Sequence, residues 1–150
     1  MVLGSQQIGM NGCLFCSIVK KDIPAEVIFK NDGAMAFLDI HPMALGHTLV
    51  IPKRHGGTIL DLSLGDFTSV FEAVREVEQM IIKFIKPDGF TLGVNQGKVS
   101  GQEIDHFHFH VVPRFNNDGG GSFQAVVRNA PKESIKEIAD KLKKNNGKSS

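Results

Sequence analysis

The chain has 150 residues, of which 41% are hydrophobic and 22% are charged, as in an ordinary soluble globular domain. Its 17 basic and 16 acidic residues leave a net charge of +1, so charge gives no reason to expect nucleic acid or an anionic membrane as the main partner. No apolar stretch approaches the roughly 20 residues of a membrane span, and the first ten residues do not resemble a signal peptide. We therefore expect a cytoplasmic protein.

Three strands are predicted in the first third of the chain. Residues 27–30 and 34–39 are predicted to form two strands joined by a tight turn at Asn31-Asp32-Gly33, because an Asp-Gly pair favours a hairpin. Residues 46–52, GHTLVIP, are apolar and β-branched and are bounded by Gly46 and Pro52, which indicates a buried strand.

A long helix is predicted next. Ser63 followed three residues later by Asp66 resembles a capping box, and apolar residues recur at helical spacing from Phe67 to Phe84. Pro87 and Gly89 are expected to end the helix.

Two further strands and a second helix complete the pattern. The strands are predicted at 90–95 and 106–113, the helix begins at about Pro131, and the tail KKNNGKSS is expected to be disordered. We therefore predict an α+β fold, with an antiparallel sheet of about five strands, one long helix packed on it, and a C-terminal helix.

Three histidines, His106, His108 and His110, occupy every second position of the last predicted strand. On a strand these side chains share one face, while Phe107 and Phe109 point to the opposite side. The alternation therefore predicts three imidazoles on one surface and an apolar anchor on the other.

The residues alone allow three interpretations of this pattern. Solvated histidines on a polar face are disfavoured by the strict alternation. One metal bound by all three does not fit a straight strand, because the outer two lie roughly 13 Å apart and a metal–nitrogen bond is about 2.1 Å. The third interpretation is a nucleophilic central histidine. A neutral imidazole can attack phosphorus when its other nitrogen is held as a hydrogen-bond donor.

The segment QEIDHFHFHVVPRF, residues 102–115, resembles the histidine-triad (HIT) family of nucleotide hydrolases and transferases, whose motif is His-x-His-x-His followed by apolar residues. The segments CLFCSIVKKDIPAEVIFKND, AFLDI, GHTLVIPKRH and GVNQG resemble the same family in the same order. We therefore expect a flexible leader over 1–12, a HIT domain over 13–115, and a C-terminal loop, helix and disordered tail over 116–150.

The resemblance implies a catalytic role for each histidine of the motif. His108 is expected to attack the α-phosphorus of a nucleotide and form a transient nucleotidyl-histidine. The carbonyl of His106 is expected to hold the other ring nitrogen of His108. His110 is expected to donate to a phosphate oxygen, and His47 to support His106 from the neighbouring strand.

The resemblance also implies residues that bind the nucleotide. Gln102 is expected to contact the phosphate or the leaving-group oxygen, Asn95 the phosphate, and Asp39 the ribose hydroxyls. Glu103 departs from the best-known eukaryotic members, which carry Ser or Thr there. An ionised carboxylate only accepts hydrogen bonds, so this difference bears on the leaving group.

Cys13-x-x-Cys16 favours a metal or redox site over a disulfide in a reducing compartment, and two histidines could complete a Cys₂His₂ set. The resemblance to bacterial-type members with this cysteine pair implies a zinc ion held by Cys13, Cys16, His55 and His106. A closed four-ligand site has no open position for water, so this zinc is expected to be structural, with no catalytic cofactor.

The resemblance implies a hydrolase or nucleotidyl transferase that cleaves substituted α-phosphates. Adenosine phosphoramidates and dinucleoside polyphosphates are the expected substrates, so the partner is a purine nucleotide, and a homodimer is expected. Two other classes remain open: a nucleotide-binding regulatory protein with little turnover, and a metal-dependent hydrolase.

Overall fold

A computed structural model of the chain describes residues 12–146. The predicted leader, apart from Gly12, and the last four residues of the predicted tail lie outside the described residues. The chain divides into two units, one that ends at Asp118 and one that begins at Gly119. Among the described residues, no helix is both long enough and apolar enough to cross a membrane.

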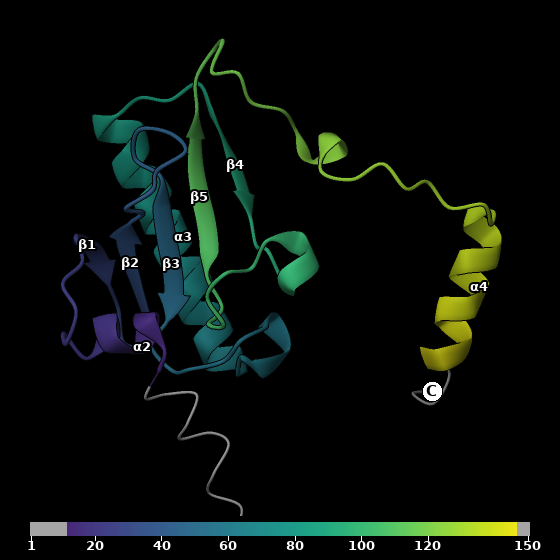
Figure 1. Ribbon diagram of the computed structural model, residues 1–150, viewed down its shortest axis with the longest axis horizontal. Coiled ribbons are helices and arrows are strands. Elements are labelled where there is room, and N and C mark those ends of the chain that lie inside the picture. Colours follow the sequence, from purple (N-terminus) through teal and green to yellow (C-terminus); the bar gives the residue numbers. More distant parts are fainter. Residues whose placement is uncertain (1–11, 147–150) are drawn as a thin grey trace, which may run out of the picture. The chain divides into compact units, whose positions relative to one another are not determined.

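The first unit is built on a five-stranded sheet in the order β1-β2-β3-β5-β4, with every neighbouring pair antiparallel (Figure 1). The first hairpin closes as predicted, because Asn31 Oδ1 accepts hydrogen bonds from the backbone N–H groups of Gly33 and Ala34, at 3.2 and 2.8 Å. The strands are β1 (Val27–Lys30), β2 (Ala34–Leu38), β3 (Thr48–Pro52), β4 (Gly89–Gly93) and β5 (Phe109–Arg114).

Helix α3 (Leu64–Phe84) covers one face of this sheet (Figure 1). The predicted capping box is present, because Ser63 Oγ accepts from the N–H of Asp66 at 3.1 Å and Asp66 Oδ2 accepts from the N–H of Ser63 at 3.2 Å. The core between helix and sheet consists of Ala34, Ala36, Val50, Val70, Ala73, Val74, Val77, Ile81, Phe107, Phe109 and Val111.

Helix α2 (Leu14–Val19) packs on the other face of the sheet, and the sequence analysis did not predict it. Because side chains alternate along a strand, the residues of β2 that do not face α3 are available to α2. This second core consists of Cys13, Phe15, Cys16, Ile18, Met35, Phe37, Leu49 and Ile51. With both faces covered, β2 and β3 are apolar almost throughout, which explains their continuous rather than alternating hydrophobic pattern.

The start of β5 corrects one predicted boundary. The predicted strand 106–113 begins only at Phe109, opposite Val50 of β3. Near the end of β3, the Pro52 carbonyl contacts a side chain instead of β5, since it lies 2.8 Å from His106 Nε2. His106 and His108 therefore precede the ladder, while His110 lies within it. Two short 3-10 turns, η1 (Ile59–Asp61) and η2 (Lys98–Ser100), lie between Pro52 and His106 in the sequence.

The second unit contains a 3-10 turn, η3 (Phe123–Ala125), and helix α4 (Ile135–Asn146). Ser134 and Glu137 cap α4 reciprocally, at 2.8 and 3.2 Å, which places its start after the predicted Pro131. The helix includes residues 143–146, so the first half of the predicted disordered tail is wrong. Lys143 and Lys144 lie in the last turn, where positive charge favours the helix.

Candidate active site

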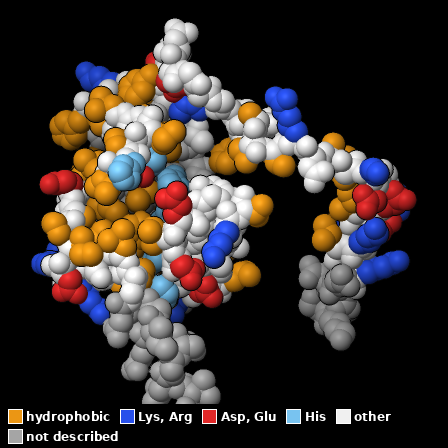
Figure 2. All heavy atoms as spheres, viewed as in Figure 1, with side chains coloured by type: hydrophobic (Ala, Val, Ile, Leu, Met, Phe, Trp, Pro, Cys, Tyr) orange, Lys and Arg blue, Asp and Glu red, His pale blue; other side chains and the backbone are white. Residues whose placement is uncertain are grey.

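Of the three alternating histidines, His106 and His108 are buried and His110 is half-buried. His106 is 0% exposed and His108 is 7% exposed, so the interpretation as a solvated polar face is wrong. Phe107 and Phe109 lie in the core beneath α3, on the opposite side, as the alternation predicted. Figure 2 shows histidine side chains beside a broad apolar area on the face opposite α3.

His108 has the geometry of a nucleophile. Its Nδ1 lies 2.7 Å from the carbonyl oxygen of His106, and a carbonyl can only accept a hydrogen bond. The proton therefore lies on Nδ1, and Nε2 keeps its lone pair. The ring is held edge-on against Phe15 of α2, with centroids 5.2 Å apart, and against His110, with centroids 5.1 Å apart. Phe15 is a site residue that the sequence analysis missed, because no motif marks it.

His47 contacts a different histidine from the one predicted. The expected support of His106 is corrected here: His47 Nε2 lies 3.0 Å from Nδ1 of His110, and both ring nitrogens of His106 have other partners. The reason is register, because Leu49 pairs with His110 across β3 and β5, and His47 lies two residues before Leu49 on the same face. His47 therefore belongs to the His110 end of the triad.

His47 and His110, which lie together at this end of the site, are neutral imidazoles. Burial, followed by the nearby His108 and His47, lowers the pKa of His110 to about 4, against the opposing effect of Asp39. Burial also lowers the pKa of His47, again against Asp39. Asp39 Oδ2 lies 3.6 Å from His47 Nε2, but a neutral His47 makes this contact polar rather than ionic.

Gln102 is fully engaged with the backbone. Its Nε2 donates to the carbonyls of Gly57 and Ile104, at 2.8 and 3.2 Å, and its Oε1 accepts from the N–H of Gly97 at 2.8 Å. Both amide protons are used, so in this structure Gln102 joins three segments around the triad. The predicted contact to the phosphate would require one of these bonds to open.

Asn95, a predicted phosphate ligand, and Glu103, the residue that departs from the eukaryotic pattern, lie in different places. Asn95 is exposed and follows β4 two residues after Gly93, which pairs with His110, so it lies at the open end of the triad strand. Glu103 instead lines a cavity of about 320 Å³ together with Cys13 and His55. Glu103 therefore lies near the predicted zinc ligands.

The four predicted zinc ligands converge. His106 Nδ1 lies 3.4 Å from Cys13 Sγ and 3.6 Å from Cys16 Sγ, and His55 Nδ1 lies 3.4 Å from Cys16 Sγ. All four ligand atoms lie within 4.8 Å of one another. Tetrahedral zinc with ordinary bond lengths separates its ligand atoms by roughly 3.4–3.8 Å, so the spacing fits this metal.

The hydrogen bonds around the cluster fit a metal as well. His106 Nε2 donates to the Pro52 carbonyl at 2.8 Å, so the lone pair lies on Nδ1, which faces the sulfurs. Burial lowers the pKa of His106 to about 4, which keeps the ring neutral and able to ligate. Burial, together with Cys13, raises the pKa of Cys16 to about 11, so a zinc ion would have to displace that proton.

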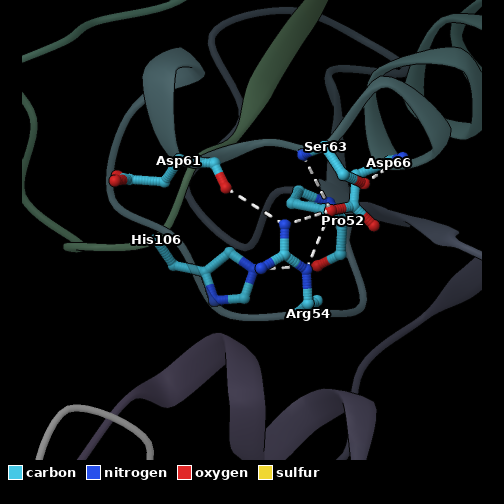
Figure 3. Close-up of polar contacts among 6 residues, drawn as sticks. All are labelled: Pro52, Arg54, Asp61, Ser63, Asp66 and His106. Carbon is cyan, nitrogen blue, oxygen red and sulfur yellow. Dashed lines mark hydrogen bonds and ion pairs between the residues drawn. The ribbon is translucent and has the colours of Figure 1, made fainter. Parts of the chain in front are cut away.

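Arg54 fixes the loop that carries His55, and the sequence pattern did not predict this role. Its guanidinium pairs with Asp66 in the first turn of α3, with Nε 2.9 Å from Oδ2, and donates to the carbonyl of Asp61 at 3.1 Å. Figure 3 shows these contacts beside the bond from His106 to Pro52. Arg54 therefore anchors the segment that supplies both the Pro52 carbonyl and His55.

A five-stranded antiparallel sheet, a long helix on one face and a His-x-His-x-His motif on the other define a histidine-triad protein. The HIT domain family model matches residues 20–117. An uncharacterized HIT-like protein of Methanocaldococcus jannaschii is 36% identical over 127 residues, covering 84% of this chain and 98% of that protein. The adenosine 5'-monophosphoramidase of Schizosaccharomyces pombe is 38% identical over 108 residues, covering 72% of this chain and 78% of the relative.

Solved structures agree with this assignment. A HIT family protein from Bacillus anthracis aligns with a TM-score of 0.80 at 30% identity, covering 93% of this chain and 99% of that one. A Zn-bound histidine triad family protein from Mycobacterium smegmatis aligns with a TM-score of 0.68 at 27% identity, covering 92% and 98%. The chain belongs to the HIT family, and it carries the Cys13-x-x-Cys16 pair.

The lowered pKa of the half-buried His110 predicts that acid destabilises the fold. An unfolded histidine takes up a proton near pH 6.5, whereas folded His110 does so only near its pKa of about 4. The unfolded state therefore binds more protons in between, and the free energy of unfolding falls as the pH drops from about 6.5 to about 4. Urea unfolding at pH 7.5 and pH 5 measures this loss. A His110→Gln variant should show a smaller difference between the two pH values, and an equal difference would contradict the assignment.

Proposed function

We propose that this protein is a nucleotide hydrolase or nucleotidyl transferase that cleaves substituted α-phosphates through a covalent nucleotidyl-His108 intermediate. The observation that carries the proposal is the hydrogen bond from His108 Nδ1 to the carbonyl of His106, which leaves the Nε2 lone pair free. The S. pombe relative is named an adenosine 5'-monophosphoramidase, which supports adenosine phosphoramidates as substrates. Dinucleoside polyphosphates present the same α-phosphorus chemistry.

The reaction proceeds in two displacements. His108 Nε2 attacks the α-phosphorus, a phosphorus–nitrogen bond forms, and the bond to the leaving group breaks as that group takes up a proton. Water, or another acceptor in a transferase, then cleaves the bond to His108 and releases the nucleotide. The carbonyl of His106 holds the ring in one orientation throughout.

Charge develops on the phosphate oxygens during both steps. His110 Nε2 is buried and is the one buried side-chain nitrogen or oxygen without a hydrogen-bond partner in the part of the chain that the structure describes. A buried polar atom without a partner is costly, so a phosphate oxygen is a natural partner for it. A preorganised donor of this kind can contribute several kcal/mol to transition-state stabilisation.

The nucleoside is recognised beside the triad. Asp39 keeps one carboxylate oxygen close to His47 and accepts from the N–H of His41 with the other, and its carboxylate suits vicinal ribose hydroxyls. The segment between β2 and β3 exposes Ile40, Met43 and Leu45, at 82%, 80% and 70%, which offers apolar contacts to a base. Asn95 is proposed as a phosphate ligand from the end of β4.

Zinc bound by Cys13, Cys16, His55 and His106 would join α2 to the loop after β3 and hold it there. We also propose a cytoplasmic homodimer. The outer side of α3 exposes Ile82 and Phe84, at 55% and 72%, an apolar surface suited to a second copy.

Two alternatives have specific tests. A regulatory nucleotide-binding protein would keep the pocket without turnover, and the free Nε2 of a buried His108 argues against it. A metal-dependent hydrolase would lose activity with a chelator wherever the fold survives. The closed Cys₂His₂ geometry argues against that function, because it leaves no position for a metal-bound water.

Intact-protein mass spectrometry after a rapid alkaline quench tests the proposal directly. Alkali is used because the phosphorus–nitrogen bond to histidine is labile in acid. With adenosine phosphoramidate, wild type is expected to gain one adenylyl group and His108→Ala none. Product release without an adduct at any time point would indicate direct attack by water. Neither product nor adduct would favour the regulatory function or a different substrate.

A further inference from the structure

The direction of one hydrogen bond decides whether His110 can donate to a phosphate. Its Nδ1 lies 3.0 Å from Nε2 of His47, and a neutral pair can share only one proton there. If His47 holds that proton, His110 carries its own on Nε2, which faces the site. If His110 donates it instead, its Nε2 is a lone pair that repels a phosphate oxygen.

A backbone amide selects between these two arrangements. The N–H of Met43 lies 3.1 Å from His47 Nδ1, and a backbone N–H can only donate. His47 Nδ1 is therefore the acceptor, and its proton lies on Nε2. We infer that the N–H of Met43 acts through His47 to hold the proton of His110 on Nε2, making Met43 a positioning residue for the phosphate donor.

The loop that carries Met43 is built to hold this amide in place. Asp39 Oδ1 accepts from the N–H of His41 at 2.9 Å, and the N–H of His47 donates to the carbonyl of Ala44 at 3.1 Å. The N–H of Asp39 also donates to the carbonyl of His47 at 3.0 Å, which closes the loop at its base. The side chain of Met43 is 80% exposed and takes no part in this hydrogen bond, which is made by the backbone N–H.

The hydrogen bond from the N–H of Met43 to His47 Nδ1 also argues against a metal site formed by Asp39, His47 and His110. Asp39, His47 and His110 offer three ligand atoms within 4.8 Å, as a metal site would. However, a ring nitrogen that carries a proton cannot ligate a metal, and the amide of Met43 keeps His47 Nε2 protonated. The cluster is therefore a chain of hydrogen bonds that runs from Met43 through His47 to His110.

Histidine tautomers in the intact, zinc-containing protein test this inference without any substrate. With ¹⁵N-labelled histidine, long-range ¹H–¹⁵N correlation spectra at pH 7.5 distinguish protonated from unprotonated ring nitrogens. We expect His47 and His110 to carry the proton on Nε2, with signals assigned through His47→Gln and His110→Gln. A proton on Nδ1 of either ring would overturn the inference.

The effect of the Met43 N–H on turnover rests on the proposed function, and a matched pair of variants tests it. Met43→Pro removes the N–H, whereas Met43→Ala keeps it, and Met43 is not among the residues with a positive φ, which proline cannot adopt. We expect Met43→Pro to shift both rings to Nδ1–H and to lower kcat roughly tenfold relative to Met43→Ala.

The outcomes separate the two proposals. A folded Met43→Pro protein with the tautomers of Met43→Ala would overturn the inference, as would equal kcat for the pair. If Met43→Pro does not fold, the wild-type spectrum alone decides. Wild type with the expected tautomers but no turnover would instead contradict the proposed function, because the spectrum requires no catalysis.

Discussion

Replacing His108 by alanine is expected to lower kcat at least about a thousandfold, while the protein still binds AMP. The covalent step is lost because the attacking lone pair belongs to His108 Nε2. Binding is expected to survive because the ring makes its hydrogen bond to the backbone carbonyl of His106, so its removal leaves no side chain without a hydrogen-bond partner. Single-turnover rates with adenosine phosphoramidate, and AMP affinity by calorimetry, measure the two quantities separately.

The matched control is His41→Ala. His41 is an exposed histidine whose backbone N–H, which alanine retains, contacts Asp39. This variant is expected to keep both the rate and the affinity of wild type. If His108→Ala kept more than a trace of the wild-type rate, the nucleophile would have to be assigned elsewhere. If it lost AMP binding together with the rate, the ring would be a binding group as well.

The central part of this site could be predicted because it depends on the local alternation of side chains, which here begins before β5. Period-two spacing places His106, His108 and His110 on one side and the phenylalanines in the core, whatever lies around them. The capping box at Ser63 and the turn at Asn31 are equally local, since their partners lie two or three residues away. Such features require no knowledge of tertiary contacts.

The contacts between distant segments could not be predicted in this way. The partner of His47 depends on the register between β3 and β5, which one sequence does not give. Arg54 pairs with Asp66 across a loop, and Phe15 reaches His108 from a short helix without a periodic pattern. The engagement of Gln102 with three backbone groups likewise depends on where the loops at Gly57 and Gly97 lie.

The proposed zinc ligands include both local features and contacts between distant segments. Cys13 and Cys16 form a local motif, and Cys13 also caps α2, with its Sγ accepting from the N–H of Cys16 at 3.5 Å. His55 and His106, in contrast, are brought to the sulfurs by β3 and by the loop that Arg54 anchors. Their assignment from sequence depended on the family resemblance, because the residue types alone did not select these two histidines.

Replacing Cys13 by serine is therefore expected to affect stability more than catalysis. Serine is a poor zinc ligand, and a three-ligand site would release the metal that joins α2 to the loop after β3. A ligand that binds only the folded state stabilises it by mass action, so its loss is expected to lower Tm on the order of 10 °C in a chain of this size. Zinc content by elemental analysis and Tm by calorimetry measure the two effects.

Turnover is expected to respond less, because the two functions of His106 use different atoms. Its ring is a proposed ligand of the metal, while its backbone carbonyl holds His108. A kcat within about tenfold of wild type, measured well below the Tm of Cys13→Ser, is consistent with a structural zinc. A chelator should lower the Tm of wild type but leave that of Cys13→Ser unchanged. Freshly purified wild type without zinc would refute the metal site, whereas loss of kcat in a fully folded, chelated protein would make the metal catalytic.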